Sequence, residues 1–218
     1  MMITAMSFGQ GFVISQYIET NSGSTPKGIE IYNNSGATVN FATTPLTVYQ
    51  GTNGAALSLT VTVNTGSLAN NAVMVIGTSD IGTYLSNNGL GSVLFVTRAF
   101  SFNGDDALEI RLNGVRQDTF GTPGVDPGTS WPAPSGGTVS TANQNIAIKC
   151  SAITAGAPAI GFTDPATRFD FVAAGAPGTG LGAAGLVGFG VAPDCAPPTC
   201  TASVAFNSAS CDAVTGGV

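Results

Sequence analysis

Short stretches of alternating apolar and polar residues, separated by turn-forming residues, run through most of this chain. In LSLTVTVN (57–64), four aliphatic side chains alternate with four polar ones. A period of two places successive side chains on opposite faces of a β-strand, whereas a helix would repeat every three to four residues. Helical periodicity is scarce elsewhere in the sequence. The alternation therefore predicts an all-β fold.

The predicted strands are short, and Gly, Asn and Pro separate them. They cover residues 12–19, 27–33, 37–41, 46–51, 57–64, 72–78, 93–97, 107–112, 115–120 and 145–150. The segment 79–89 has room for one helical turn, with Ser79 or Asp80 as its N-cap. Many short strands with turn signals between them are typical of a β-sandwich or barrel.

The composition favours an extracellular protein. Only 8% of the 218 residues are charged, against roughly a quarter in typical soluble domains, while 43% are hydrophobic. Ser, Thr, Asn and Gly supply the polar surface instead. Six basic and twelve acidic residues give a net charge of −6, with no basic run. This charge balance argues against direct nucleic-acid binding.

Histidine is absent from the sequence. Its absence removes Ser-His-Asp triads, Cys-His dyads, imidazole general bases and the common zinc sites that have histidine ligands. Most hydrolytic chemistry at neutral pH is difficult to build without these groups. We therefore expect a protein that is not an enzyme and has no catalytic residues and no organic cofactor.

The four cysteines, Cys150, Cys195, Cys200 and Cys211, crowd toward the C-terminus. An even number suggests disulfides formed in an oxidising compartment, and three pairings are possible. A four-cysteine zinc site is the alternative. Zinc ribbons use two close pairs of cysteines, and only Cys195 and Cys200 form one here. The spacing thus favours disulfides without choosing the pairing.

The stretch SFNGDDALEIRLNGVRQDTFG (101–121) contains the densest group of acids. Asn113-Gly114 joins two alternating segments and predicts a two-residue type I′ hairpin. Asp105 and Asp106 precede the first of these strands, where aspartates commonly accept backbone N–H bonds. The alternative is a structural Ca²⁺ site in which these two residues act with Asp118 and Asp126, because Ca²⁺ prefers oxygen ligands. No EF-hand spacing is present, so turn capping is favoured.

Several segments together resemble the bacterial lamin-tail domain. They are VISQYIETNSGSTPKGIEIYNNSGATVNF, LTVYQGTNG, NNAVMVIGTSD, SFNGDDALEIRLNGVRQDTFGTPGVDPGTSW and STANQNIAIKCSAITAG, in the family's order. FTDPATRFDF and GTGLG resemble its closing segment, although Phe169 stands where that family usually has Trp. The resemblance covers residues 12 to 184. It implies an immunoglobulin-like β-sandwich that serves as an accessory module of large secreted or surface proteins.

The expected organisation is a lamin-tail-like sandwich over residues 1–190. A Cys/Pro linker and the first strand of a following module would occupy residues 191–218. The function expected first is a noncatalytic adhesion or partner-binding module of a secreted or cell-surface bacterial protein. One alternative is a subunit of an extracellular filament or layer, assembled by strand addition through the alternating TASVAFNS tail. Another is the targeting domain of a secreted nuclease.

The expected partners are a protein or a surface glycan, or further copies of this chain. Trp131 is a candidate for stacking on a sugar ring, although packing at the edge of the sandwich is the favoured interpretation. The apolar tract that begins at Phe171 is rich in Gly and Pro. It is therefore a poor candidate for a membrane span, and we expect none.

Overall fold

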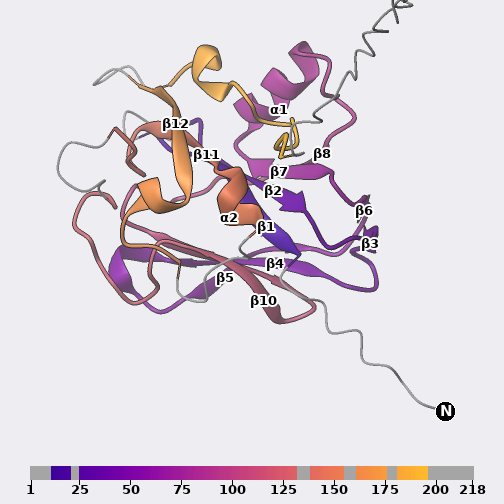
Figure 1. Cartoon of the computed structure of the whole chain (residues 1–218), viewed down its shortest axis with the longest axis horizontal. Helices are drawn as coiled ribbons and strands as arrows, with labels where there is room; N and C mark the ends of the chain where they lie inside the picture. The colour runs from indigo at the N-terminus through magenta and orange to yellow at the C-terminus, as the bar shows by residue number, and fades with distance from the viewer. Residues whose placement is uncertain (1–10, 21–24, 132–137, 155–160, 176–180, 196–218) are drawn as a thin grey trace, which may run out of the picture.

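Two β-sheets packed face to face form the body of the protein (Figure 1). The computed structural model describes residues 11–20, 25–131, 138–154, 161–175 and 181–195. The larger sheet has the strand order β12 (Phe169–Ala174), β11 (Gln144–Ile148), β1 (Phe12–Ile18), β2 (Gly28–Asn33), β7 (Val73–Gly77), β8 (Leu94–Thr97). The smaller sheet has the order β10 (Val115–Phe120), β9 (Ala107–Leu112), β4 (Leu46–Gly51), β5 (Ser58–Val63). The predicted all-β class is confirmed.

The main hydrophobic core lies between these two sheets. Alternation along β9 sends Leu108, Ile110 and Leu112 into it, as the sequence pattern requires. Tyr17 on β1 stacks on Phe120 of β10 with ring centroids 4.3 Å apart. Because aromatic and branched side chains from both sheets interdigitate here, burial of apolar surface is the main force that holds the sheets together.

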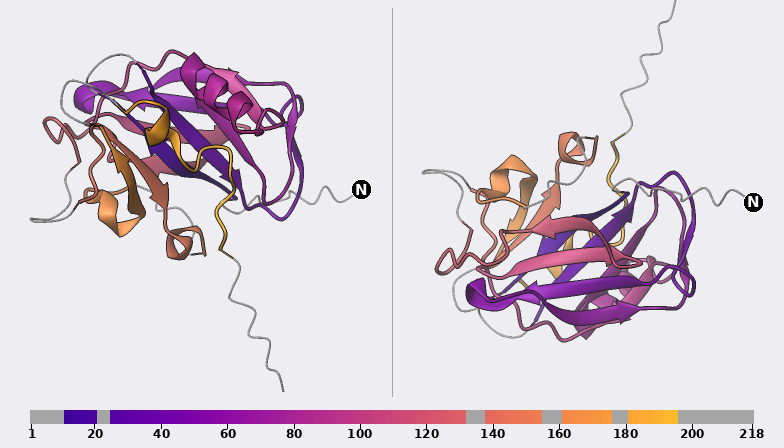
Figure 2. Two further views of the ribbon diagram at one scale, coloured as in Figure 1. Left: turned by 90° about the horizontal axis from the view of Figure 1, so that it is seen from above. Right: turned by 90° about the horizontal axis from the view of Figure 1, so that it is seen from below.

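A third layer covers the outer face of the six-stranded sheet. It consists of helix α1 (Ser79–Asn87) and residues 181–195, which we call the C-terminal strap and which include the 3₁₀ turn η3 (Ala183–Leu186). Figure 2 shows, in its left panel, both segments lying across the sheet, on the side opposite the four-stranded sheet. The contact forms a second apolar cluster: Ile18, Val75, Ile81, Leu85, Leu181, Leu186 and Phe189.

The predicted hairpin at Asn113-Gly114 is confirmed. Both residues have positive φ, 49° and 80°, as a type I′ turn requires. The turn pairs Leu112 with Val115 at the start of the β9–β10 ladder. All ten predicted strands correspond to observed ones. The bounds of 46–51, 107–112 and 115–120 match, and the others shift by at most two residues at either end. The segment expected at 37–41 shortens to β3 (Val39–Asn40), paired with β6 (Ser67–Leu68).

Other elements differ from the expectation. Helix α1 has nine residues rather than one turn, and its N-cap is Thr78, not Ser79 or Asp80. It connects β7 to β8, which pair in parallel, so the sheet contains a β-α-β crossover. The short elements η1 (Thr52–Gly54), α2 (Cys150–Thr154) and η2 (Pro165–Thr167) and the strands β6 and β12 were not predicted.

The described chain continues past residue 190, where the domain was expected to end. Ala192 and Cys195 pack against the main core, so residues 191–195 are attached to the sandwich. The rest of the expected linker and strand, 196–218, lies outside the described residues. None of the helices that the structure describes is long and apolar enough to cross a membrane.

Candidate functional site

Asp106 organises the loops at one end of the four-stranded sheet. Its Oδ1 accepts the backbone N–H of Asn53 at 2.9 Å, and its Oδ2 accepts Gln50 Nε2 at 2.9 Å and the N–H of Asn103 at 3.3 Å. These bonds join the turn before β9 to the end of β4 and to η1. The expected role of Asp106 as an acceptor of backbone N–H bonds is confirmed.

Asp105 is buried beside this turn with a carboxylate oxygen that has no partner. The residue is 5% exposed, and its Oδ1 makes no hydrogen bond. Burial raises the pKa of this carboxyl, and the nearby charge of Asp126 raises it further. Desolvation without a full set of hydrogen bonds disfavours the charged form.

Asp126 belongs to a surface loop that meets η1. Its Oδ1 accepts the N–H of Gly128 at 2.8 Å, and the residue is exposed. A Cβ placed on Gly54 would lie 2.9 Å from the backbone nitrogen of Asp126, and Gly54 has φ of 73°. Glycine at position 54 therefore permits both the left-handed turn and the close approach of the two loops.

Glu19 and Lys27 extend this group of acids toward the interior. Lys27 Nζ lies 3.3 Å from Glu19 Oε1 and donates to the carbonyl of Phe102 at 2.5 Å. Burial raises the pKa of Glu19, and the charge of Asp105 contributes in the same direction, although the Asn143 N–H and Lys27 oppose it. Burial, followed by the charges of these acids, also raises the pKa of Tyr17.

Four carboxylates thus act on one another within this region, with Lys27 as the cation bound among them. We call the group Glu19, Asp105, Asp106 and Asp126 the acidic end. Sequence reasoning found the three aspartates but not Glu19. A glutamate just after a strand carries no local signal of burial, because the N–H that its Oε2 accepts belongs to Asn143, 124 residues away.

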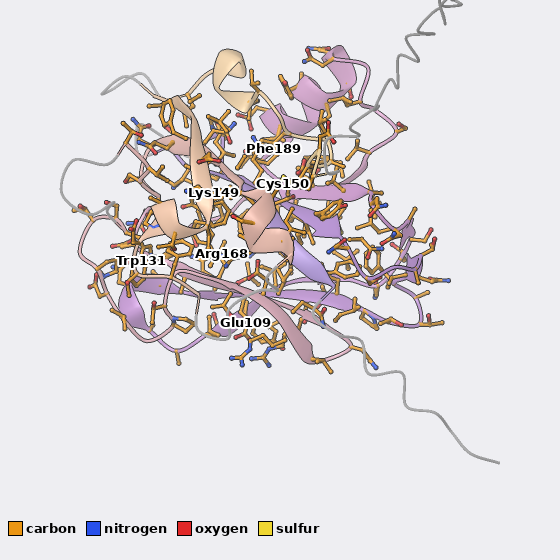
Figure 3. All side chains as sticks on the ribbon, in the orientation of Figure 1. Glu109, Trp131, Lys149, Cys150, Arg168 and Phe189 are labelled. Atoms are coloured by element: carbon orange, nitrogen blue, oxygen red, sulfur yellow. A yellow bond between two sulfur atoms is a disulfide. The ribbon has the colours of Figure 1, made fainter. Side chains whose placement is uncertain are left out.

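Asp118 lies elsewhere, inside the sandwich. Its Oδ2 accepts the N–H of Ile14 at 2.8 Å and Arg168 Nη2 at 2.9 Å, while its Oδ1 accepts the N–H of Thr119 at 2.7 Å. Arg168 also donates from Nη1 to the carbonyl of Thr119 at 2.8 Å. Figure 3 shows Arg168 in the middle of the molecule. Asp118 therefore joins β10 to β1 and does not join the other three aspartates predicted as calcium ligands.

Within the described ranges, no group of three or more His, Cys, Asp and Glu side chains is close enough to hold a metal ion by itself. A cation at the acidic end would need further oxygen ligands in addition to side-chain carboxylates. Structural Ca²⁺ therefore stays a prediction, without Asp118 among its ligands.

Cys150 and Cys195 form a disulfide. It ties the end of the C-terminal strap to α2, which follows β11, and Figure 3 shows Cys150 at this position. The disulfide interpretation is confirmed for this pair, and the four-cysteine zinc site is wrong, because two of its four ligands are bonded to each other. Cys200 and Cys211 lie outside the described residues.

Trp131 packs inside the protein, as the favoured interpretation expected. It is 2% exposed, and its ring meets Phe162 edge to face with centroids 6.3 Å apart. Its backbone N–H donates to Thr141 Oγ1 at 2.9 Å. A ring so deeply buried presents no face on which a sugar could stack.

A polar layer beneath the C-terminal strap was not predicted. Gln16 Nε2 donates to the carbonyl of Val187 at 2.7 Å, and Asn145 Nδ2 donates to those of Gly185 and Val187 at 2.7 and 3.0 Å. Glu30 accepts Ser15 Oγ and the N–H of Gly190, both at 2.7 Å. Burial raises the pKa of Glu30 to about 7.

Comparisons of this chain with protein-family profiles, with curated proteins and with solved structures find no match.

Proposed function

We propose that this chain is a noncatalytic accessory module of a secreted or cell-surface bacterial protein, with a role in adhesion or partner binding. Its fold would be an immunoglobulin-like sandwich of the lamin-tail type. The resemblance of residues 12 to 184 to that family supports this finer class, as do two facing sheets and a core formed by alternating strands.

One observation carries the noncatalytic part of the proposal: the buried acids serve the protein's own fold. Six acidic residues are at most 5% exposed: Glu19, Glu30, Asp105, Asp106, Glu109 and Asp118. Five of them bind backbone N–H groups, hydroxyls or cations of the chain itself. A general acid or base must instead reach a substrate within hydrogen-bonding distance.

The disulfide supports an extracellular location, because such bonds persist in oxidising compartments. The low charge content and the net charge of −6 are compatible with a surface module and unfavourable for nucleic-acid binding. The expected partners are therefore a protein or a surface glycan.

Binding and catalysis can be tested on the same purified chain. We expect saturable retention on bacterial envelope fractions or on a glycan array, with no turnover of ester, glycoside, phosphodiester or nucleic-acid substrates. The double variant Asp105→Asn/Asp106→Asn is the catalytic control. Hydrolysis by the wild type that this variant loses would overturn the noncatalytic assignment, and absence of binding to every envelope fraction would overturn the adhesive role.

A filament or layer subunit is the second candidate. The outermost strands of the described sheets are β12 and β8 in one and β10 and β5 in the other. β12 carries Phe171 at 44% exposed, and β5 carries Leu59 at 57%. Open edges with exposed apolar side chains are the geometry that accepts an added strand. A targeting role within a secreted nuclease is the third candidate, and the catalytic domain would then lie outside this sequence.

A further inference from the structure

Of the four acids at the acidic end, Glu19 has Lys27 beside it, whereas Asp105, Asp106 and Asp126 form no ion pair among the described residues. All six Lys and Arg residues lie in the described ranges. Five of them form ion pairs with Glu19, Glu109, Asp118 or Asp170: Lys27, Arg111, Arg116, Lys149 and Arg168. None of the five pairs with Asp105, Asp106 or Asp126. The effects that raise the pKa of Asp105 are burial and the charge of Asp126, and no lysine or arginine opposes them.

Asp105 is buried with one carboxylate oxygen that has no hydrogen-bond partner. Only 5% of the residue is exposed, and Oδ1 has no hydrogen-bond donor. Nearly all buried polar atoms in folded proteins are paired, because an unpaired one costs about 1–3 kcal/mol. The neighbouring Asp106 shows the contrast, since three donors meet its two oxygens.

The loops around Asp105 bring further oxygen atoms close to it. Asp126 lies on an exposed loop, and the N–H of Gly128 donates a hydrogen bond to its Oδ1. η1 lies against the same loop at Gly54 and is held to the β9 turn by Asp106. Backbone carbonyls of these three loops are hard oxygen ligands of the same kind as the carboxylates.

We propose that Asp105 and Asp126 bind one Ca²⁺ ion between the loops, with backbone carbonyls and water completing the coordination. Ca²⁺ accepts six to eight oxygen ligands in irregular geometry, whereas Mg²⁺ demands a near-ideal octahedron. Asp106 is a positioning residue, because its oxygens are occupied in holding η1. Bound Ca²⁺ provides the missing partner of Asp105 and links the loop of Asp126 to the sandwich. Carboxylate ligands must be deprotonated to bind the ion, so affinity falls at acidic pH.

The test is calorimetric titration of the chelator-treated chain with CaCl₂ and, in parallel, with MgCl₂. We expect a single Ca²⁺ per chain and weaker binding of Mg²⁺. At a free Ca²⁺ concentration about ten times Kd, Tm should rise by about 3–6 °C. Asp105→Asn and Asp126→Asn should each weaken binding at least about tenfold.

Asp105→Asn removes a buried charge and keeps the side-chain shape, so this variant should remain folded without calcium. Asp170→Asn is the matched control: its carboxylate is 71% exposed on β12, and its loss should leave Ca²⁺ affinity unchanged. Two results would each overturn the proposal. One is the absence of any saturable heat and Tm change in the wild type at millimolar Ca²⁺. The other is binding that Asp105→Asn and Asp126→Asn do not alter.

Discussion

The Asp118–Arg168 pair is the most deeply buried ion pair among the described residues, with side chains 0% and 5% exposed. Arg168→Met should lower the free energy of unfolding by about 3–5 kcal/mol, because it leaves Asp118 charged and without its cation inside the sandwich. Denaturant titration measures the loss. Arg116→Met is the control, since Arg116 is 47% exposed and 4.0 Å from Glu109, where a pair contributes at most about 1 kcal/mol.

The double variant Asp118→Asn/Arg168→Met shows whether Arg168→Met loses stability through the unpaired charge of Asp118 or through lost packing of Arg168. The side-chain amide that this variant carries in place of the Asp118 carboxylate retains an oxygen for the N–H of Ile14. The double variant should therefore recover part of the stability that Arg168→Met loses. Equal stability of the two variants would show that Arg168 acts through packing rather than through the charge of Asp118.

Glu30 makes stability depend on pH near neutrality. Its folded-state pKa of about 7 lies above the ordinary value of 4.5. A raised carboxyl pKa means that the folded state binds the proton more tightly than the unfolded state does. The stabilisation that protonated Glu30 gives the folded state is therefore fully present below pH 4.5 and is lost as pH rises through 7. The difference of about 2.5 pKa units corresponds to about 3 kcal/mol.

Glu30→Gln should remove this dependence. The Gln oxygen can accept the N–H of Gly190 while its amide donates to Ser15 Oγ, reproducing the protonated acid. Unfolding titrations at about pH 5 and about pH 8, on either side of the Glu30 pKa, should show a smaller decline for the variant than for the wild type. Other buried acids with raised pKa values, such as Asp106 and Asp118, contribute equally to the pH dependence of stability in the wild type and in Glu30→Gln. Identical declines would contradict the prediction.

Sequence reasoning at the residue scale succeeded where the cause is local. Asn113-Gly114 forms its turn locally, and Asp106 accepts the N–H of Asn103 three residues before it, so turn chemistry identified both. The bonds of Asp106 to Gln50 and Asn53 span more than 50 residues and were not predicted. Sequence reasoning also missed Glu30, because alternate polar positions on a sandwich strand normally face water. The strap that buries Glu30 contacts it through Gly190, 160 residues away. The partner of Asp118 is likewise 50 residues distant.

Among the elements, the C-terminal strap depends most on a covalent bond. Cys150 and Cys195 close a loop with a sequence separation of 45 residues. Cys150→Ser/Cys195→Ser should cost about 2–4 kcal/mol, mainly by releasing the unfolded chain from this constraint. Hydrogen exchange should accelerate in residues 181–195 before it does in α1, which keeps its own helical bonds. Unchanged protection of the strap would contradict this.

The strands were predictable as elements because alternation is a property of each segment alone. β12 was missed because FDFVAA follows a Pro-containing turn and shows little alternation, and it becomes a strand by pairing with β11. The parallel pairing of β7 with β8 was also missed. It depends on α1 crossing over the sheet face, where Ile81 and Leu85 pack on Val75 and Ile18.

At the scale of the whole molecule, the remaining choice is between a module that acts singly and a subunit that assembles. Electron microscopy and light scattering of the full chain should be compared with a chain ending at Cys195, which keeps the disulfide intact. Strand addition through TASVAFNS (201–208) predicts filaments only from the full chain. Val204→Pro keeps the length of the tail but removes one backbone N–H, so it should reduce assembly.

Each outcome of this comparison assigns a role. If the chain ending at Cys195 also assembles, the contact between copies lies within the described sheets. Phe171→Lys on the edge strand β12 should then prevent assembly. If the full chain stays monomeric at high concentration, the filament candidate is wrong. The open edges and exposed apolar residues would then be available to a different protein, which agrees with an accessory module whose partner is not a copy of itself.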